Sequence, residues 1–190
     1  MPLSFSLDTA EREVLSDLAR RSIEISLSGN FTEVVLPEGV TEASHAVLFR
    51  RLGAFVTLKL QGQLRGCIGT IVSQVPLYVT VWNMAHAAAF QDPRFPALRE
   101  GEWPFIDVDI SVLDELTPCT NPDDIVIGRH GLLLQYRGYS GVFLPQVPVE
   151  QGWNRLEYLE NLCRKAGLPI GVWKEADARL YWYEAFVFKA

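Results

Sequence analysis

The chain has 190 residues, 48% of them hydrophobic and 11% aromatic, and its formal net charge is −6. This composition supplies a full core, which excludes a disordered chain, and the acidic balance argues against a broad basic face for nucleic acid. No apolar run approaches the roughly 20 residues that span a bilayer. The first residues lack the layout of a signal peptide, and three distant cysteines make poor disulfide partners. We therefore expect a protein of the reducing cytoplasm that does not associate with membranes.

The first half of the chain combines two predicted helices with three predicted strands. Asp8 and Glu11 match a capping box at the start of the first helix, and Gly29 ends it. Alternating apolar residues on both sides of a Gln61–Gly62 turn predict a hairpin. We predict, in chain order, a helix over 8–27, strands over 54–60 and 63–68, a helix over 76–90 and a strand over 105–113.

The second half repeats the order of a hairpin followed by a helix. We predict strands over 132–136 and 142–147 around a loop at 138–141, a helix over 150–166 and a terminal strand over 180–188. Hairpins joined by helices are typical of an α+β fold with a largely antiparallel sheet. The two hairpin–helix blocks suggest a structural duplication, and no linker separates them. We expect a single domain over residues 1–190.

The segment 64–69 places Cys67 between two glycines and two residues from Arg65. Gly66 and Gly69 leave room for backbone or ligand beside the thiol, because they carry no side chain. Strand alternation puts Arg65 and Cys67 on one face, and a neighbouring guanidinium favours the thiolate. Cys67 is therefore a candidate nucleophile or redox thiol. The alternative is that Cys67 is a small buried apolar group and that the glycines serve packing.

Histidines and a loop arginine are further candidates. His86 or His130 is the predicted base for the Cys67 thiol, and His130 at a strand entrance is alternatively a hydrogen-bonded structural residue. Arg94, close to Asp92, either grips a substrate carboxylate or phosphate or only pins the end of a helix.

The remaining chemical signals are weak. Pro145 interrupts a predicted strand, so backbone groups near Gln146 are candidates for contact with a ligand. No Cys-x-x-Cys or His-x-x-x-His spacing predicts a metal site, and three cysteines are too few for an iron–sulfur cluster. No Walker A motif or dinucleotide fingerprint is present, so we predict no cofactor.

The run Leu-Arg-Gly-Cys-Ile-Gly at 64–69 resembles the signature of the AMMECR domain family. Companion segments that resemble the same family follow in order over nearly the whole chain, at 53–58, 88–95, 108–113, 128–132, 144–147 and 165–169. The signature is specific together with these companions, whereas any one of them alone is not.

The resemblance implies an α+β fold of two unequal, intimately packed lobes with a cleft near the signature. It also implies an association with a Memo-like protein and a radical S-adenosylmethionine enzyme, the partners of this family in the AmmeMemoRadiSam system. The family has no securely assigned reaction. Carried onto this chain, the motif residues are Arg65, Gly66, Cys67, Gly69, Asp92, Arg94, Phe95, His130 and Gln146.

The leading hypothesis is a cleft around Arg65 and Cys67 that binds an anionic small molecule or peptide. Arg65 and Arg94 would bind the anion, Cys67 would act as nucleophile or redox thiol, and His130 would manage protons. The substrate-binding set is Arg65, Gly66, Gly69, Asp92, Arg94, Phe95 and Gln146. Whether the protein is an enzyme stays open at this point.

Two other classes of function compete with this hypothesis. The first is a non-catalytic adaptor that docks on the Memo-like or radical enzyme through the edge of the glycine-rich hairpin. The second is nucleic-acid binding, which needs a local basic face. The candidate cluster for such a face is Arg50, Arg51, Lys59 and Arg65. The acidic balance of the chain argues against this second class.

Overall fold

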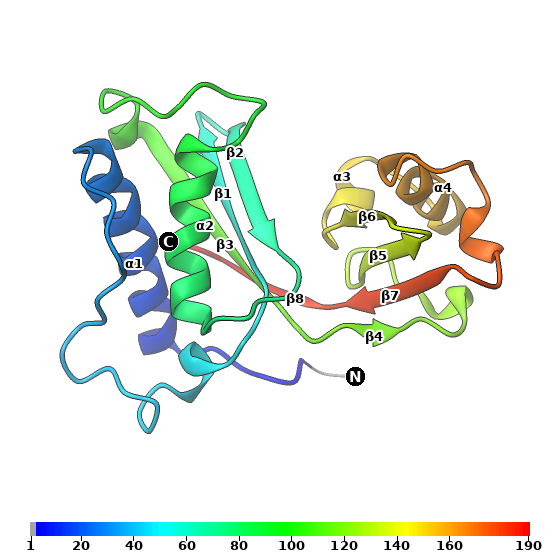
Figure 1. Cartoon of the computed structure of the whole chain (residues 1–190), viewed down its shortest axis with the longest axis horizontal. Helices are drawn as coiled ribbons and strands as arrows, with labels where there is room; N and C mark the ends of the chain where they lie inside the picture. Colours follow the sequence, from blue (N-terminus) through cyan, green and yellow to red (C-terminus); the bar gives the residue numbers. More distant parts are fainter. Residues whose placement is uncertain (1–2) are drawn as a thin grey trace. The chain divides into compact units, whose positions relative to one another are not determined.

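The computed structural model describes residues 3–190, and their contacts divide the chain into two compact units (Figure 1). The larger unit comprises residues 3–113 and 186–190, and the smaller unit comprises residues 114–185. Both units combine helices with antiparallel strands, which confirms the predicted α+β class. Among the described residues, no helix has the length and apolar character that crossing a membrane requires.

The larger unit is a four-stranded sheet with two helices on one face. The strand order is β2-β1-β3-β8, and α1 and α2 lie side by side against the sheet (Figure 1). The elements are α1 (Thr9–Leu27), β1 (Ala54–Leu60), β2 (Gln63–Thr70), α2 (Leu77–Phe90), β3 (Ile106–Leu113) and β8 (Ala185–Lys189). Short 3-10 helices cover Ala46–Phe49 and Trp103–Phe105.

The core of the larger unit forms between the helices and one face of this sheet. Val56 and Leu58 of β1 pack with Ile110 of β3 and with Leu15 of α1, and all four are fully buried. The predicted capping box at Asp8 is confirmed, because the Asp8 carboxylate accepts the N–H of the third helical residue at 2.8 Å. Residues that alternate with the core positions, such as Thr57, project from the opposite face of the sheet.

The smaller unit repeats this plan on a smaller scale. Its sheet has the order β4-β7-β5-β6, and α4 packs against β5 and β6. The elements are β4 (Thr117–Pro118), β5 (Gly131–Tyr136), β6 (Tyr139–Phe143), α3 (Val147–Glu150), α4 (Arg155–Lys165) and β7 (Arg179–Tyr183). Short 3-10 helices cover Pro122–Asp124 and Val172–Lys174. Leu132 and Leu134 of β5 pack with Leu159 and Leu162 of α4 in its core.

The predicted second hairpin was wrong in its turn and in its returning strand. The turn consists of Arg137 and Gly138, with φ of 47° and 87°, so the strand returns at Tyr139 and ends at Phe143. A two-residue turn with both φ values positive matches the twist of a hairpin, but arginine is a rare choice for its first position. Pro145 consequently lies beyond the strand instead of interrupting it.

Two other predicted elements differ in the structure. The helix expected over 150–166 begins only at Arg155, as α4, because Gly152 has φ of 67° and Asn154 caps α4 with its side chain. The terminal strand expected over 180–188 is interrupted at Glu184, so its halves join different sheets as β7 and β8.

Candidate functional site

Arg65 is an extra residue in the pairing of β2 with β1. Leu58 pairs with Gly66 and Lys59 pairs with Leu64, which leaves Arg65 without a partner of its own. Such a β-bulge interrupts the alternation of side chains along the strand. The prediction that regular strand alternation places Arg65 and Cys67 on one face was therefore wrong.

The guanidinium of Arg65 binds the loop that precedes β3. It donates to both carboxylate oxygens of Glu102 at 2.8 and 3.1 Å and to the carbonyl oxygen of Pro96 at 2.9 Å. Only 10% of the Arg65 side chain is exposed. The hydrogen bond from Arg65 lowers the pKa of Glu102. These contacts anchor the loop on β2, and the anion-binding role of Arg65 stays a prediction.

Asp92 and Arg94 close the outer edge of β2 at Cys67. The N–H of Cys67 donates to Oδ2 of Asp92 at 2.9 Å, and Nη2 of Arg94 donates to the Cys67 carbonyl at 3.3 Å. Arg94 also donates to both carboxylate oxygens of Asp92, at 2.9 and 2.7 Å. The pair thus satisfies the backbone of Cys67 as a neighbouring strand would. The side-chain hydrogen bonds from Arg94 are the main cause that holds the pKa of the Asp92 carboxyl far below its ordinary value. Hydrogen bonds from two backbone N–H groups lower this pKa further.

The thiol of Cys67 lies on the sheet face that is opposite the helices. Cys67 pairs with Thr57, whose hydroxyl donates to Sγ at 3.2 Å, and the cysteine is half-buried. Arg94, with 54% of its side chain exposed, interacts electrostatically with Cys67. The hydrogen bond with Asp92 is the main cause that raises the pKa of Arg94, and the charge of a Cys67 thiolate raises it further. The sequence analysis attributed this electrostatic partnership to Arg65.

Protein contacts account for both glycines of the signature. A Cβ on Gly66 would lie 2.1 Å from the carbonyl oxygen of Ala88 near the end of α2. A Cβ on Gly69 would lie 2.2 Å from the ring of Phe55. Both positions thus need glycine so that other parts of the protein can approach the strand. Their assignment to ligand binding stays a prediction.

Phe95 and His86 have structural contacts in the larger unit. The guanidinium of Arg94 lies 5.4 Å from the centre of the Phe95 ring, so the aromatic ring supports the arginine. Nδ1 of His86 is 2.8 Å from the Ser26 hydroxyl of α1, and its ring stacks on Phe31. His86 therefore belongs to the helical side of the unit, away from the face that carries the thiol.

His130 and Gln146 belong to the smaller unit. Nδ1 of His130 accepts the N–H of Val126 at 3.2 Å, and its ring lies 4.7 Å from that of Trp182. Burial is the main cause that lowers the pKa of His130, so its imidazole is neutral at pH 7. The side-chain oxygen of Gln146 is buried, and no hydrogen-bond partner for it occurs within residues 3–190.

The structure therefore assembles a site from the signature and the loop after α2, within the larger unit. The sequence analysis missed Thr57 and Glu102. Regular register counted from the Gln61–Gly62 turn would place Val56 opposite the cysteine, and only the bulge at Arg65 brings Thr57 there. Nothing local in the sequence indicates Glu102. Residues 3–190 contain no group of three or more histidine, cysteine, aspartate or glutamate side chains placed to hold a metal ion.

Comparisons with known proteins identify the family of this chain. The AMMECR1 family model matches residues 16–188. The chain belongs to the AMMECR1 family. Protein NEQ441 of Nanoarchaeum equitans is 37% identical over 185 residues, which cover 92% of this chain and 98% of that protein. Protein TK0174 of Thermococcus kodakarensis is 38% identical over 187 residues, or 93% of this chain and 89% of that protein.

A solved structure extends the similarity to the fold. The crystal structure of the uncharacterized protein PH0010 from Pyrococcus horikoshii is 36% identical, and the TM-score is 0.88. The match covers 97% of this chain and 94% of that chain. The names of these AMMECR1 relatives state no reaction, so they support the family and the fold.

Proposed function

We propose that the Cys67 site binds an anionic group of a small molecule or peptide and presents Cys67 as a nucleophilic thiol. The position of Arg94 carries this proposal. Its guanidinium is held by Asp92 and contacts the Cys67 carbonyl, yet more than half of the side chain is exposed. A guanidinium that is fixed on one edge and open on the other can bind a carboxylate or phosphate from solvent.

The proposed chemistry uses the sulfur as an electron-pair donor. The Cys67 thiol loses its proton to solvent, and the sulfur forms a bond to an electrophilic carbonyl carbon of the ligand. The π electrons of that carbonyl move to its oxygen, whose negative charge Arg94 stabilises. Solvent is the proposed proton acceptor because Nδ1 of His130 already accepts the N–H of Val126. This chemistry would serve the AmmeMemoRadiSam pathway that the family resemblance implies.

Alkylation of the three cysteines tests the proposal within one sample. Iodoacetamide reacts with thiolates, and mass spectrometry reports the rate at each cysteine across a pH series. Cys163 is fully buried, and burial, with the charge of Asp124, raises the pKa of Cys119 to about 11. Both cysteines therefore serve as internal controls. We expect Cys67 to react at least about tenfold faster than Cys119 at pH 7.5.

Substitutions at Arg94 separate an active thiol from a merely accessible one. Arg94→Gln should slow alkylation of Cys67 at pH 7 by about three- to tenfold, and Arg94→Lys should restore part of the rate. Arg21→Gln on α1 is the matched control, because Arg21 is an exposed arginine of the same unit. Equal rates in the Arg94→Gln and Arg21→Gln variants, or a Cys67 that reacts no faster than Cys119, would contradict the proposal.

A second candidate function is a non-catalytic adaptor for the Memo-like protein or the radical S-adenosylmethionine enzyme. It is supported by the position of β2 at the edge of its sheet: the Asp92–Arg94 pair closes this edge at Cys67, whereas Leu64 near the turn is 43% exposed. An exposed edge can pair with a strand of a partner. A Cys67→Ala variant that co-purifies with these partners and keeps full cellular function would favour the adaptor. Retained binding with lost function would favour thiol chemistry.

A further inference from the structure

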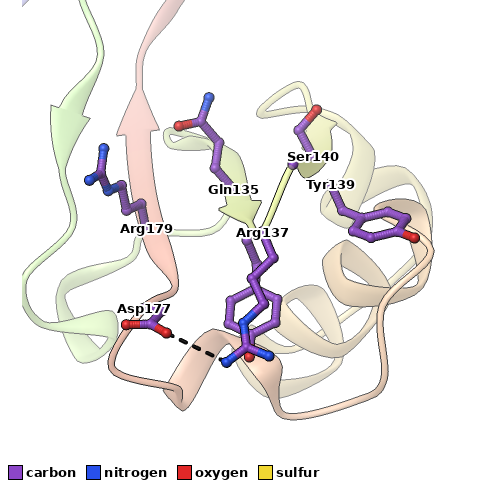
Figure 2. Close-up of a pocket in the computed structure, with 8 residues that line it drawn as sticks. Gln135, Arg137, Tyr139, Ser140, Asp177 and Arg179 are labelled. Carbon is purple, nitrogen blue, oxygen red and sulfur yellow. Dashed lines mark ion pairs between the residues drawn. The ribbon is translucent and has the colours of Figure 1, made fainter.

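The smaller unit carries a hollow of about 420 Å³ that is separate from the Cys67 site. Its lining comes from the ends of β5 and β6, the turn between them and the residues that lead into β7 (Figure 2). Leu132, Leu134 and Leu180 of the same strands face α4 in the core. Gln135 and Arg179 alternate with these leucines, so they project from the sheet face that α4 does not cover.

Three polar side chains form a row across this hollow. Gln135 of β5 pairs directly with Ser140 of β6 on one side and with Arg179 of β7 on the other. Figure 2 shows Gln135 between these two neighbours. Adjacent strands are about 4.8 Å apart, so the row of hydroxyl, amide and guanidinium spans about 10 Å. This length matches that of a short polar ligand in an extended conformation.

The groups in this row are available for a ligand. All three side chains are exposed, and within residues 3–190 none of them has a hydrogen bond or an ion pair. Arg137 at the end of the hollow differs, because it pairs with Asp177 at 3.6 Å (Figure 2). Its guanidinium also lies over the ring of Tyr136.

The charge of the hollow favours a single negative group. Asp177 offsets the charge of Arg137, which leaves the guanidinium of Arg179 as the uncompensated charge. One positive charge matches a carboxylate better than it matches a phosphate dianion. The amide of Gln135 beside it can both donate and accept a hydrogen bond, as recognition of a peptide group requires.

We propose that this hollow binds the carboxyl terminus of a peptide. Arg179 takes the terminal carboxylate in a bidentate contact, Gln135 bonds the amide that precedes it, and Ser140 bonds the next polar group along the chain. A small N-acylated amino acid shares the carboxylate and the adjacent amide, so the test includes it as a second source. The proposal is independent of the Cys67 chemistry and does not fail with it.

A titration of the full-length protein followed by ¹H–¹⁵N NMR tests this proposal. The probes are N-acetyl-triglycine, its C-terminal amide, N-acetylglycine and inorganic phosphate, all at constant ionic strength. The free-acid peptide should shift the backbone signals around Gln135 and Arg179 saturably, and its amide should bind at least about tenfold more weakly. Tighter binding of the peptide than of N-acetylglycine supports a peptide terminus, and equal binding supports the small acylated amino acid with the same contacts.

Exposed substitutions keep the test clear of folding defects. Arg179→Gln should weaken binding of the free-acid peptide by at least about tenfold, while Arg164→Gln on α4 should change it less than twofold. The spectra themselves report whether each variant is folded. Shifts that do not saturate, equal binding of acid and amide, preference for phosphate, or equal loss in the Arg164→Gln variant would overturn the proposal.

Discussion

The hairpins β1–β2 and β5–β6 are built in the same way in the two units. Each turns through two residues of positive φ, a non-glycine followed by a glycine: Gln61 and Gly62 at 51° and 78°, and Arg137 and Gly138 at 47° and 87°. In both sheets the first strand of the hairpin also pairs with a later antiparallel strand, β3 in one and β7 in the other. Both units thus contain a hairpin, a helix and a third strand in the same order, although no sequence repeat indicates this.

The correspondence extends to the packing of a helix on the second strand. A Cβ on Gly66 of β2 would lie 2.1 Å from the Ala88 carbonyl oxygen near the end of α2. A Cβ on Gly141 of β6 would lie 2.7 Å from the backbone nitrogen of Ala166, just after α4. Both hairpins therefore use a glycine to bring the end of a helix onto the sheet.

One inserted residue distinguishes the two hairpins. Counted from the turn, the strands correspond once Arg65 is left out, and the residue after the packing glycine is Cys67 in β2 and Val142 in β6. The insertion carries the buried guanidinium that holds the loop after α2. That loop supplies Asp92 and Arg94 to the backbone of Cys67. A single bulge thus distinguishes the hairpin that carries the Cys67 site from the one that has Val142 at the equivalent position.

Alanine at the packing glycines is expected to have the largest effect and tests whether the hairpins are equivalent. Gly66→Ala should lower the free energy of unfolding by about 3 kcal/mol or more, because the contacted atom belongs to the backbone of α2. Gly141→Ala should cost about 2 kcal/mol, since its contacts are less close. Urea unfolding followed by tryptophan fluorescence measures both changes.

Gly101→Ala is the matched control for these variants. Gly101 has nothing within 4 Å of an added Cβ and does not have a positive φ. Its substitution should change stability by less than about 1 kcal/mol. If Gly66→Ala were as mild as Gly101→Ala, the close approach of α2 to β2 would be wrong and the equivalence would fail.

Removing the guanidinium of the bulge should have the next largest effect. Arg65→Gln should lower the free energy of unfolding by about 2–3 kcal/mol, because Glu102 loses its charged partner and the carbonyl of Pro96 loses its donor. Arg137→Gln is the control in the other hairpin, where the ion pair is exposed and should contribute less than about 0.5 kcal/mol. Urea unfolding gives both values.

A double variant shows whether the Arg65 effect comes from its pairing. Adding Glu102→Gln to Arg65→Gln should cost less than the sum of the two single substitutions, because each single change leaves a partner unsatisfied. Additive costs would mean that Arg65 supports the loop by its bulk alone, and the bulge would then lose its special role in the comparison.

Local signals in the sequence predicted the elements of the larger unit well. The capping box at Asp8, the Gln61–Gly62 turn and the alternation along β3 each depend on neighbouring residues, and the structure confirms them. The predicted bounds of the returning strand in the second hairpin were wrong, because an arginine with positive φ is rare at the first position of a two-residue turn. The division of the last strand between two sheets depends on tertiary pairing that no local pattern shows.

The candidate site was predictable in its members but not in its contacts. The motif around Cys67 and the Asp92–Arg94 pair are visible as sequence, so the residues could be selected. The bulge at Arg65 leaves no trace in the apolar pattern, and its partner Glu102 lies 37 positions away. The sequence analysis therefore assigned the thiol's guanidinium to Arg65, whereas Arg94 is the arginine that interacts electrostatically with Cys67.

Loss of stability in acid should distinguish the edge of β2 from the edge of β6. This is the smallest of the predicted effects. Asp92→Asn should lower the free energy of unfolding by about 1–2 kcal/mol at pH 7, since Arg94 and the Cys67 N–H lose a charged acceptor. Within residues 3–190, no acidic side chain bonds the N–H of Val142, the equivalent position of β6. Asp177→Asn in the smaller unit is therefore the control, with no change expected.

The pH dependence follows from the direction of the Asp92 shift. Its pKa is far below the ordinary value in the folded protein, so its contribution is complete above about pH 5 and is lost as the pH falls below about 4 towards the folded pKa. Urea unfolding should therefore show a gap between the wild type and Asp92→Asn that is wide at pH 7 and narrower at pH 3. Hydrogen exchange should place the acid-induced loss of protection in β2 before β6. A gap of equal size at both pH values would mean that Asp92 acts without its charge, and the two edges would then differ only in packing.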